Sequence, residues 1–120
     1  MIKKVLIANR GEIAVRIIRA LRAMSIKSVS VYSTADKDGL WTKLADEKIC
    51  IGSANASESY LNITNLISAA LYTHCDAIHP GVGFLSESAT FVEAVEKSGL
   101  IFIGPNKDTI NLLGNKVEAR

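Results

Sequence analysis

The sequence predicts a three-layer α/β domain built on a doubly wound parallel sheet of about five strands. First, short β-rich runs alternate along the chain with segments whose apolar residues recur every three or four positions. Second, the runs VLIA and IFI are wholly apolar, which is typical of strands covered by helices on both faces. Third, the 120 residues suffice for one small core. Right-handed crossovers then favour the strand order 3-2-1-4-5.

Each element has its own signal in the chain. The strands are expected at residues 3–9, 26–33, 48–52, 75–79 and 100–104. The helices are expected at residues 11–24, 40–47, from a cap at Asn62 onward, 88–99 and 105–114. Gly99 and Gly114 stand where the last two helices should stop, and Pro105 lies near the start of the final one.

Two helices indicate which of their residues should face the core. The first carries an apolar stripe at Ile13, Ile17, Ala20 and Met24, flanked by Ala14, Ile18 and Leu21. The third is expected to turn inward Ile63, Leu66, Ile67, Ala70 and Leu71. Both patterns fit helices that pack on one face of a sheet.

Composition and charge exclude several classes of protein. The chain is 48% hydrophobic and 22% charged, with a net charge of +2 and interspersed signs, so no nucleic-acid-binding face is expected. Its apolar runs are too short to cross a membrane. The basic start is followed by only VLIA before Asn9, which argues against export. Cys50 and Cys75 lack metal-ligand spacing, so we interpret them as two buried thiols in a reducing cytoplasm and expect no metal site.

The turn after the first predicted strand is where a doubly wound sheet usually binds a nucleotide. Here it reads ANRGEIA, with one glycine instead of G-x-G-x-x-G, and Asn9 and Arg10 would crowd a pyrophosphate. Arg10 either binds an anion near the helix N-terminus or ties down a neighbouring loop. Asp36, after the second strand, could imitate the acid that holds a ribose, but without the glycine fingerprint this match is weak.

The sequence HPGVGFLSES, residues 79–88, lies at the predicted topological switch point. Gly81 and Gly83 permit positive φ and close backbone approach, and Pro80 stiffens the loop. Phe84 and Leu85 are expected to anchor the loop to the core. The stretch as a whole allows two interpretations, which are a rigid loop facing a crevice and a purely structural turn.

One polar residue of this stretch argues against a phosphate site, and another is more typical of the core than of a catalytic site. Glu87 can satisfy free amides at the next helix N-terminus, and a phosphate loop would rarely place a carboxylate there. His79 is expected to be a hydrogen-bonded histidine of the core, because no nucleophile stands at a recognisable spacing. By composition alone, Lys116 is a solvated surface charge.

The end of the chain suggests continuation. Residues 115–120, NKVEAR, look like the start of another helix that is cut off. The domain is therefore expected to span residues 1–114, with 115–120 beginning a connection to a further domain.

Taken together, these motifs resemble those of the biotin carboxylase family, in its N-terminal domain. The matching stretches are IANRGEIAVRIIRA (7–20), YSTADKD (32–38), LADEKICIG (44–52), SYLNI (59–63), AIHPGVGFLSES (77–88), FIGP (102–105) and GNK (114–116). Each is weak alone, but their order and spacing over the whole chain are specific.

The resemblance implies a Rossmann-like pre-ATP-grasp domain that precedes an ATP-grasp lid and a C-terminal domain. The complete enzyme would be an ATP-dependent ligase that uses ATP, Mg²⁺ and bicarbonate to carboxylate biotin on its carrier protein. Biotin carboxyl carrier protein, carboxyltransferase and a second copy of the chain are the implied partners. The implied parent is acetyl-CoA carboxylase, for fatty acid synthesis, with pyruvate or propionyl-CoA carboxylase as the alternative.

The resemblance also assigns roles to residues. Lys116 would contact ATP, which replaces the surface-charge interpretation. The loop with His79, Gly81, Val82, Gly83 and Glu87 would face the biotin and bicarbonate site. Arg19 would lie in a dimer contact. The family's catalytic residues and metal ligands lie outside this segment, so the segment alone is expected to be inactive and to bind no cofactor.

Some positions differ from the family's commonest pattern. Val82 replaces an aromatic residue, Asn115 an aspartate, Ser88 an asparagine and Trp41 a histidine, and Ala23 stands where the acidic partner of Arg19 is sometimes found. Two hypotheses of other classes remain, which are an autonomous nucleotide-binding or regulatory module and a structural domain that supplies a wall and a dimer surface. A module would need a glycine fingerprint or an acidic phosphoacceptor pocket, and neither is evident.

Overall fold

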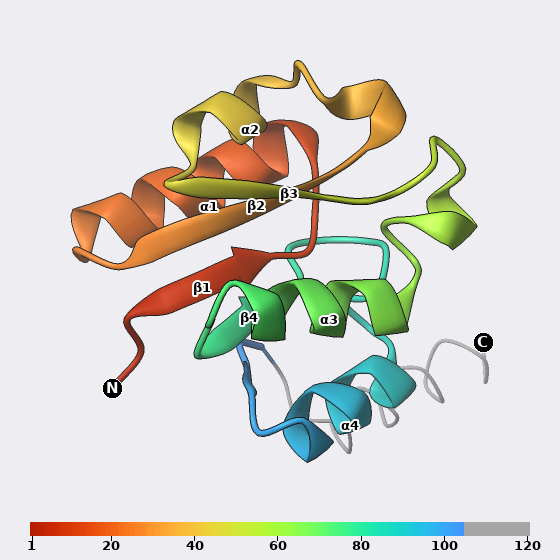
Figure 1. Cartoon of the computed structure of the whole chain (residues 1–120). Coiled ribbons are helices and arrows are strands. Elements are labelled where there is room, and N and C mark those ends of the chain that lie inside the picture. Colours follow the sequence, from red (N-terminus) through yellow and green to blue (C-terminus); the bar gives the residue numbers. More distant parts are fainter. Residues whose placement is uncertain (105–120) are drawn as a thin grey trace, which may run out of the picture.

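Five parallel strands form one sheet in the order β3-β2-β1-β4-β5, which confirms the predicted fold class and strand order (Figure 1). The structure is a computed structural model and describes residues 1–104. The strands are β1 (Lys4–Ile7), β2 (Lys27–Ser33), β3 (Glu47–Gly52), β4 (Ala77–His79) and β5 (Ile101–Phe102). The helix expected at 105–114 and the connection at 115–120 lie outside the described residues.

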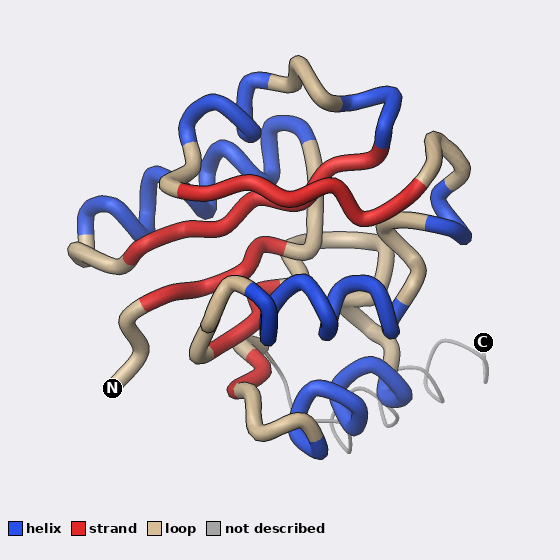
Figure 2. Tube along the Cα trace, viewed as in Figure 1, coloured by secondary structure: helices blue, strands red, loops and turns tan. Residues whose placement is uncertain are grey.

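Helices alternate with the strands along the whole described chain (Figure 2). They are α1 (Gly11–Ala23), α2 (Leu40–Leu44), α3 (Ile63–Tyr72) and α4 (Ala89–Lys97), with single 3₁₀ turns at Thr34–Asp36 and Ala56–Glu58. The cap predicted for α3 is confirmed, because the Asn62 side chain accepts a hydrogen bond from the backbone N–H of Asn65.

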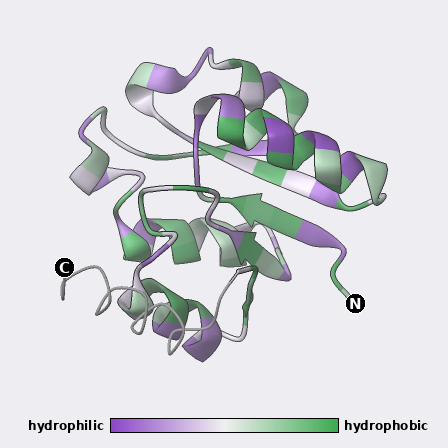
Figure 3. Cartoon of the chain, turned by 180° about the vertical axis from the view of Figure 1, so that it is seen from behind, coloured by the Kyte–Doolittle hydropathy of each residue, from purple (hydrophilic) through white to green (hydrophobic). Residues whose placement is uncertain are grey.

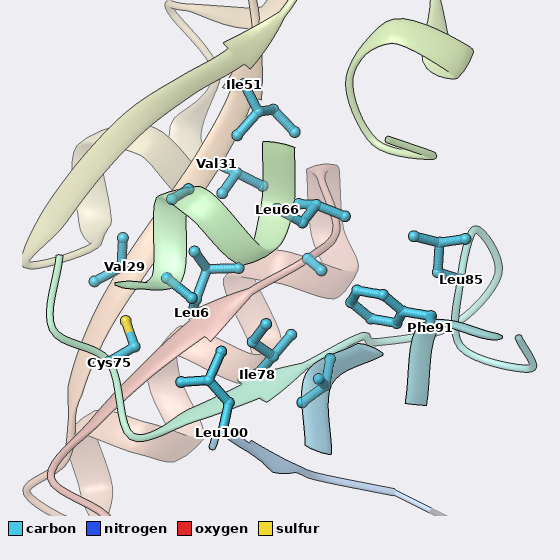
Figure 4. Packing of buried hydrophobic residues seen from close by; sticks show 14 of the residues in the cluster. Leu6, Val29, Val31, Ile51, Leu66, Cys75, Ile78, Leu85, Phe91 and Leu100 are labelled. Atoms are coloured by element: carbon cyan, nitrogen blue, oxygen red, sulfur yellow. The ribbon is translucent and has the colours of Figure 1, made fainter. Parts of the chain in front are cut away.

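The two faces of the sheet bury separate hydrophobic clusters because successive strand residues point to opposite sides. On β1, Leu6 packs toward α3 and α4, whereas Val5 and Ile7 pack toward α1 and α2. Figure 4 shows the first cluster, in which Leu6 and Phe91 are fully buried. Each such side chain contributes roughly 1.5–3 kcal/mol on burial. In Figure 3 most of β1 is hydrophobic, whereas hydrophilic residues interrupt the helices.

Three predictions about single side chains are wrong. On α1 the buried residues are Ala14, Val15, Ile18 and Leu21. The predicted stripe beside them is partly exposed, and Met24, just past the helix end, is 65% exposed. Leu71 is 49% exposed, because its position after Ala70 turns it about 100° from the buried face of α3.

Cys50 is the third error. It lies on the edge strand β3 and points away from the face that buries Ile51, so its thiol is exposed. Cys75 is buried as predicted, and burial raises the pKa of its thiol. No helix within residues 1–104 is both long and apolar enough to cross a membrane.

Candidate functional site

Two loops leave the carboxyl end of the sheet side by side, at the point where the strand order reverses. β1 and β4 are neighbours, with Ile7 opposite His79, and the backbone N–H of Ala8 donates to the carbonyl of His79 at 2.9 Å. We call residues 8–10 the first turn and residues 80–83 the glycine loop. Figure 1 shows both chain segments emerging at this end of the sheet.

Asn9 joins the two loops. Its side chain is buried, and its Nδ2 donates to the carbonyl oxygens of Pro80 at 2.9 Å and Val82 at 2.7 Å. Its Oδ1 accepts from the backbone N–H of Arg10 at 2.8 Å. Both amide donors and the acceptor are therefore engaged, as a buried polar side chain requires.

Both glycines of the glycine loop adopt the positive φ that the sequence predicts, with φ of +70° at Gly81 and +74° at Gly83. Their surroundings differ. A Cβ at Gly81 would lie 2.6 Å from Nδ2 of Asn9, whereas a Cβ at Gly83 would meet nothing within 4 Å. The predicted close approach therefore occurs at Gly81 and not at Gly83.

His79 braces the same loop from its other side. Its Nδ1 accepts a hydrogen bond from the backbone N–H of Gly81 at 3.0 Å, so the hydrogen-bonded histidine that the sequence predicts is confirmed, although its side chain is only half-buried. Burial lowers the pKa of the His79 imidazole. The neutral ring is the form that can accept this bond.

An ion pair closes the first turn. Arg10 donates from Nε and Nη2 to the two carboxylate oxygens of Asp36, at 2.9 and 3.0 Å. The hydroxyl of Tyr60 donates to Oδ2 of Asp36 at 2.7 Å, and the hydroxyl of Ser33 donates to the same atom at 3.2 Å. The Arg10 guanidinium also lies 5.6 Å from the Trp41 ring centroid.

This network decides between the two interpretations of Arg10. Pairing with Asp36 raises the pKa of Arg10 and lowers the pKa of the Asp36 carboxyl, so both groups stay charged and matched. Burial, aided by Asp36, raises the pKa of Tyr60 to about 12. Arg10 thus ties down a neighbouring loop instead of offering a free anion site. The carboxylate that could have held a ribose is already engaged.

The remainder of the HPGVGFLSES stretch is anchored differently from the prediction. Leu85 is buried, as expected, but Phe84 is 39% exposed and packs on Tyr60, with ring centroids 5.3 Å apart. Ser88, not Glu87, caps α4, because its hydroxyl accepts from the backbone N–H of Phe91 at 3.1 Å. Glu87 is exposed, so its predicted role at the helix N-terminus is wrong.

The structure brings together some of the predicted site residues. Gly81, Val82 and Gly83 lie in the glycine loop, which follows His79 at the end of β4, and Val82 is 70% exposed. Arg19 is exposed on α1, outside this loop. Lys116 lies outside the described residues. Within residues 1–104, no group of three or more His, Cys, Asp or Glu side chains gathers where it could hold a metal ion.

Sequence reasoning missed two contributors to the site. Asn9 was expected only to crowd a phosphate, and Tyr60 had no assigned role. Tyr60 is separated by 24 residues from Asp36, whose carboxylate it contacts, and no local spacing indicates such a pair. A polar residue two positions past the end of a buried strand, such as Asn9, was the available signal.

Fold and site together define a doubly wound α/β domain whose usual nucleotide position is occupied by its own side chains. A family model described as "Biotin carboxylase, N-terminal domain" matches residues 1–110. The chain belongs to this family, as its motifs indicated. It is 62% identical over 119 residues to a biotin carboxylase of Allochromatium vinosum, covering 99% of this chain and 26% of that protein.

Solved structures give the same result. A complete multifunctional pyruvate carboxylase from Rhizobium etli matches with a TM-score of 0.93 and 47% identity over 99% of this chain and 12% of that one. A biotin carboxylase complex from Campylobacter jejuni matches with a TM-score of 0.90 and 54% identity over 93% of this chain and 25% of that one. The chain thus spans about a quarter of the length of the curated biotin carboxylases it matches.

Proposed function

We propose that this chain is the N-terminal domain of an ATP-dependent ligase that carboxylates biotin on a carrier protein, using ATP, Mg²⁺ and bicarbonate. Acetyl-CoA carboxylase, in the cytoplasm, is the preferred parent, ahead of pyruvate or propionyl-CoA carboxylase. The match of residues 1–110 to the biotin carboxylase N-terminal family carries this proposal. The 62% identity to a curated biotin carboxylase over nearly the whole chain supports it.

Within that enzyme, residues 1–114 would supply one wall of the carboxylation site and residues 115–120 would lead into the ATP-grasp domain. The glycine loop supports this assignment, because it is fixed from behind while Val82 and Gly83 face outward. Within residues 1–104 the backbone N–H groups of Val82 and Gly83 have no hydrogen-bond partner. Two free donors on a rigid, exposed loop can bind a carboxylate or ureido oxygen.

The remaining partners follow from the same proposal. The ATP-grasp and C-terminal domains of the same enzyme, biotin carboxyl carrier protein and carboxyltransferase would surround this domain. Arg19, exposed on α1, would contribute to a homodimer contact. An autonomous nucleotide-binding module is the weaker alternative, since Arg10 and Asp36 neutralise each other where such a module would bind its ligand.

The direct test is bicarbonate-dependent ATP cleavage, with and without free biotin, by the full-length chain, meaning the complete enzyme of which these 120 residues would be the N-terminal domain. Biotin-stimulated cleavage is expected from the full-length chain and none from the 120-residue segment. Lys116→Ala should raise the KM for ATP by roughly 10- to 150-fold, since one charge-assisted hydrogen bond is lost. The matched control is Lys97→Ala, which removes an exposed lysine paired with Glu93 and should leave that KM within about twofold.

Two results would contradict this proposal. A full-length chain that cleaves ATP without any response to biotin would refute the carboxylase function. Unchanged constants for ATP in Lys116→Ala would return that lysine to the class of solvated surface charges.

A further inference from the structure

Within residues 1–104, Asn9 is the only side chain at the end of β1 that hydrogen-bonds to the glycine loop. Its Nδ2 bonds two carbonyl oxygens that lie one residue apart, at 2.9 Å to Pro80 and 2.7 Å to Val82. Gly81, between them, passes so close that any side chain there would collide with Asn9. One amide group therefore holds both sides of the residue at the centre of the loop.

The two bonds fix the direction of the loop's peptide groups. Carbonyl oxygens of Pro80 and Val82 point inward to the same nitrogen, and a peptide N–H lies opposite to its own C=O. The N–H that follows each carbonyl therefore points the other way. For the carbonyl of Val82 that N–H belongs to Gly83, which is exposed.

We propose that Asn9 is a positioning residue for biotin carboxylation, since it turns the Gly83 N–H toward the substrate without touching the substrate itself. This inference rests on the proposed function, in which the glycine loop faces biotin and bicarbonate. Asn9 suits the role because it is buried, and because its own Oδ1 is held by the backbone N–H of Arg10. Arg10 is in turn fixed by Asp36, so the amide cannot rotate freely.

The sharpest variant is Asn9→Asp in the full-length chain. Aspartate has the same shape, but it replaces the Nδ2 donor by an oxygen that faces two carbonyl oxygens, while it still accepts from Arg10. The loop should lose its fixed peptide orientation. The matched control is Asn65→Asp, which removes a similar donor, from Nδ2 of Asn65 to the carbonyl of Ile51 at 2.7 Å.

The readout is the KM and kcat for free biotin and for ATP, together with the melting temperature of each variant. Asn9→Asp should lower kcat/KM for biotin on the order of tenfold to a hundredfold and leave the KM for ATP within about twofold. Asn65→Asp should affect the melting temperature alone. Asn9→Ala, which removes the donor without adding charge, should show the same selectivity if the aspartate variant does not fold.

The outcomes separate the two proposals. Selective loss toward biotin in the Asn9 variants supports the positioning role. Equal losses toward ATP and biotin, or unchanged constants in a folded Asn9 variant, overturn it and leave Asn9 as a structural residue. Biotin-stimulated ATP cleavage by the wild-type full-length chain is measured before any variant is compared. If it is absent, the proposed function itself is refuted.

Discussion

The first turn and the glycine loop lie side by side at one end of the sheet, yet they are fixed by different means. Charge fixes the first turn, through the bidentate pair of Arg10 and Asp36. The glycine loop is fixed by neutral hydrogen bonds to Asn9 and His79 and by backbone conformations that glycine tolerates.

This difference leaves the two loops with different groups available to a ligand. In the first turn the charges satisfy each other, so an incoming phosphate would have to displace Asp36 from Arg10. In the glycine loop the fixing contacts are made by Asn9 and His79, and they leave Val82 and Gly83 exposed. In this chain the Arg10–Asp36 pair thus lies at the usual nucleotide position of the fold, and the neighbouring loop is exposed.

The largest expected effect tests the steric half of the glycine loop. Gly81→Ala and Gly83→Ala both place a Cβ at a φ near +70°, which costs about 1–2 kcal/mol. Only Gly81→Ala also drives that Cβ against Asn9, which adds about 1–3 kcal/mol of overpacking. We expect Gly81→Ala to lose the larger free energy of unfolding, measured by urea titration with the fluorescence of Trp41. Equal losses at the two positions would show that Asn9 yields to the new methyl group.

The second prediction tests the ionic half. Asp36→Asn should cost about 1.5–3 kcal/mol of unfolding free energy at pH 7, since a partly buried carboxylate loses its charge-assisted bonds. The exposed Asp38 two residues away provides the control, because Asp38→Asn removes the same charge without those bonds. A cost that is equal in the two variants would mean that net charge, and not the Arg10 pair, is responsible.

The pH dependence of the same variant has a defined sign. Arg10 lowers the pKa of Asp36 in the folded chain, so the unfolded chain binds a proton more tightly. The stabilisation is therefore complete above the unfolded pKa of about 3.9 and is lost as pH falls through the lower folded value. The advantage of wild type over Asp36→Asn should shrink below about pH 4, and urea titrations at pH 7 and pH 3 measure it.

These contrasts also show what the sequence could and could not predict. The fold was predictable because the run VLIA has no polar residue, which indicates a strand covered on both faces. Val5 and Leu6, which face opposite sides of the sheet, are indeed both buried. The positive φ of Gly81 and Gly83 was predictable, because a loop between a strand and a helix offers glycine few other uses. Arg10 was correctly expected as one of two alternatives, but its partner could not be chosen from spacing.

What failed depended on single-residue register or on distant contacts. The cap of α4 falls on Ser88 and not on Glu87, which is a shift of one position. Tyr60 contacts Asp36 across a separation of 24 residues, and such a contact depends on the tertiary fold. Cys50 is exposed because β3 is an edge strand and Cys50 points away from the face that buries Ile51. The predicted strand order already placed this strand at the edge, but the register of its side chains was not predicted.

The third prediction concerns the far end of the glycine loop, where it enters α4. Ser88→Ala should cost about 0.5–2 kcal/mol, because the backbone N–H of Phe91 loses its capping partner. Glu87→Ala should stay within about 0.5 kcal/mol, since Glu87 is exposed and does not cap the helix. Urea unfolding of both variants measures the difference, and a larger loss at Glu87 would restore the original interpretation of that carboxylate.

The smallest expected effect distinguishes the two loops by pH. His79 accepts the N–H of Gly81 through Nδ1, and a protonated imidazole cannot accept a hydrogen bond. Because burial lowers the pKa of His79 below its ordinary value of about 6.5, the bond should be complete at neutral pH and lost as pH falls through the folded pKa. The loss is about 0.5–1.5 kcal/mol and should be confined to the glycine loop. The first turn, by contrast, should keep its ion pair over this range, since Asp36 titrates only at lower pH.

Amide proton shifts and exchange rates of Gly81 and Arg10, followed by NMR from pH 7.5 to pH 5, measure both loops in one sample. His74→Gln serves as the control for the exposed histidine, and His79→Phe should abolish the response of Gly81. A Gly81 amide that responds to pH equally in His79→Phe, or an Arg10 amide that follows it, would show that the two loops share one switch.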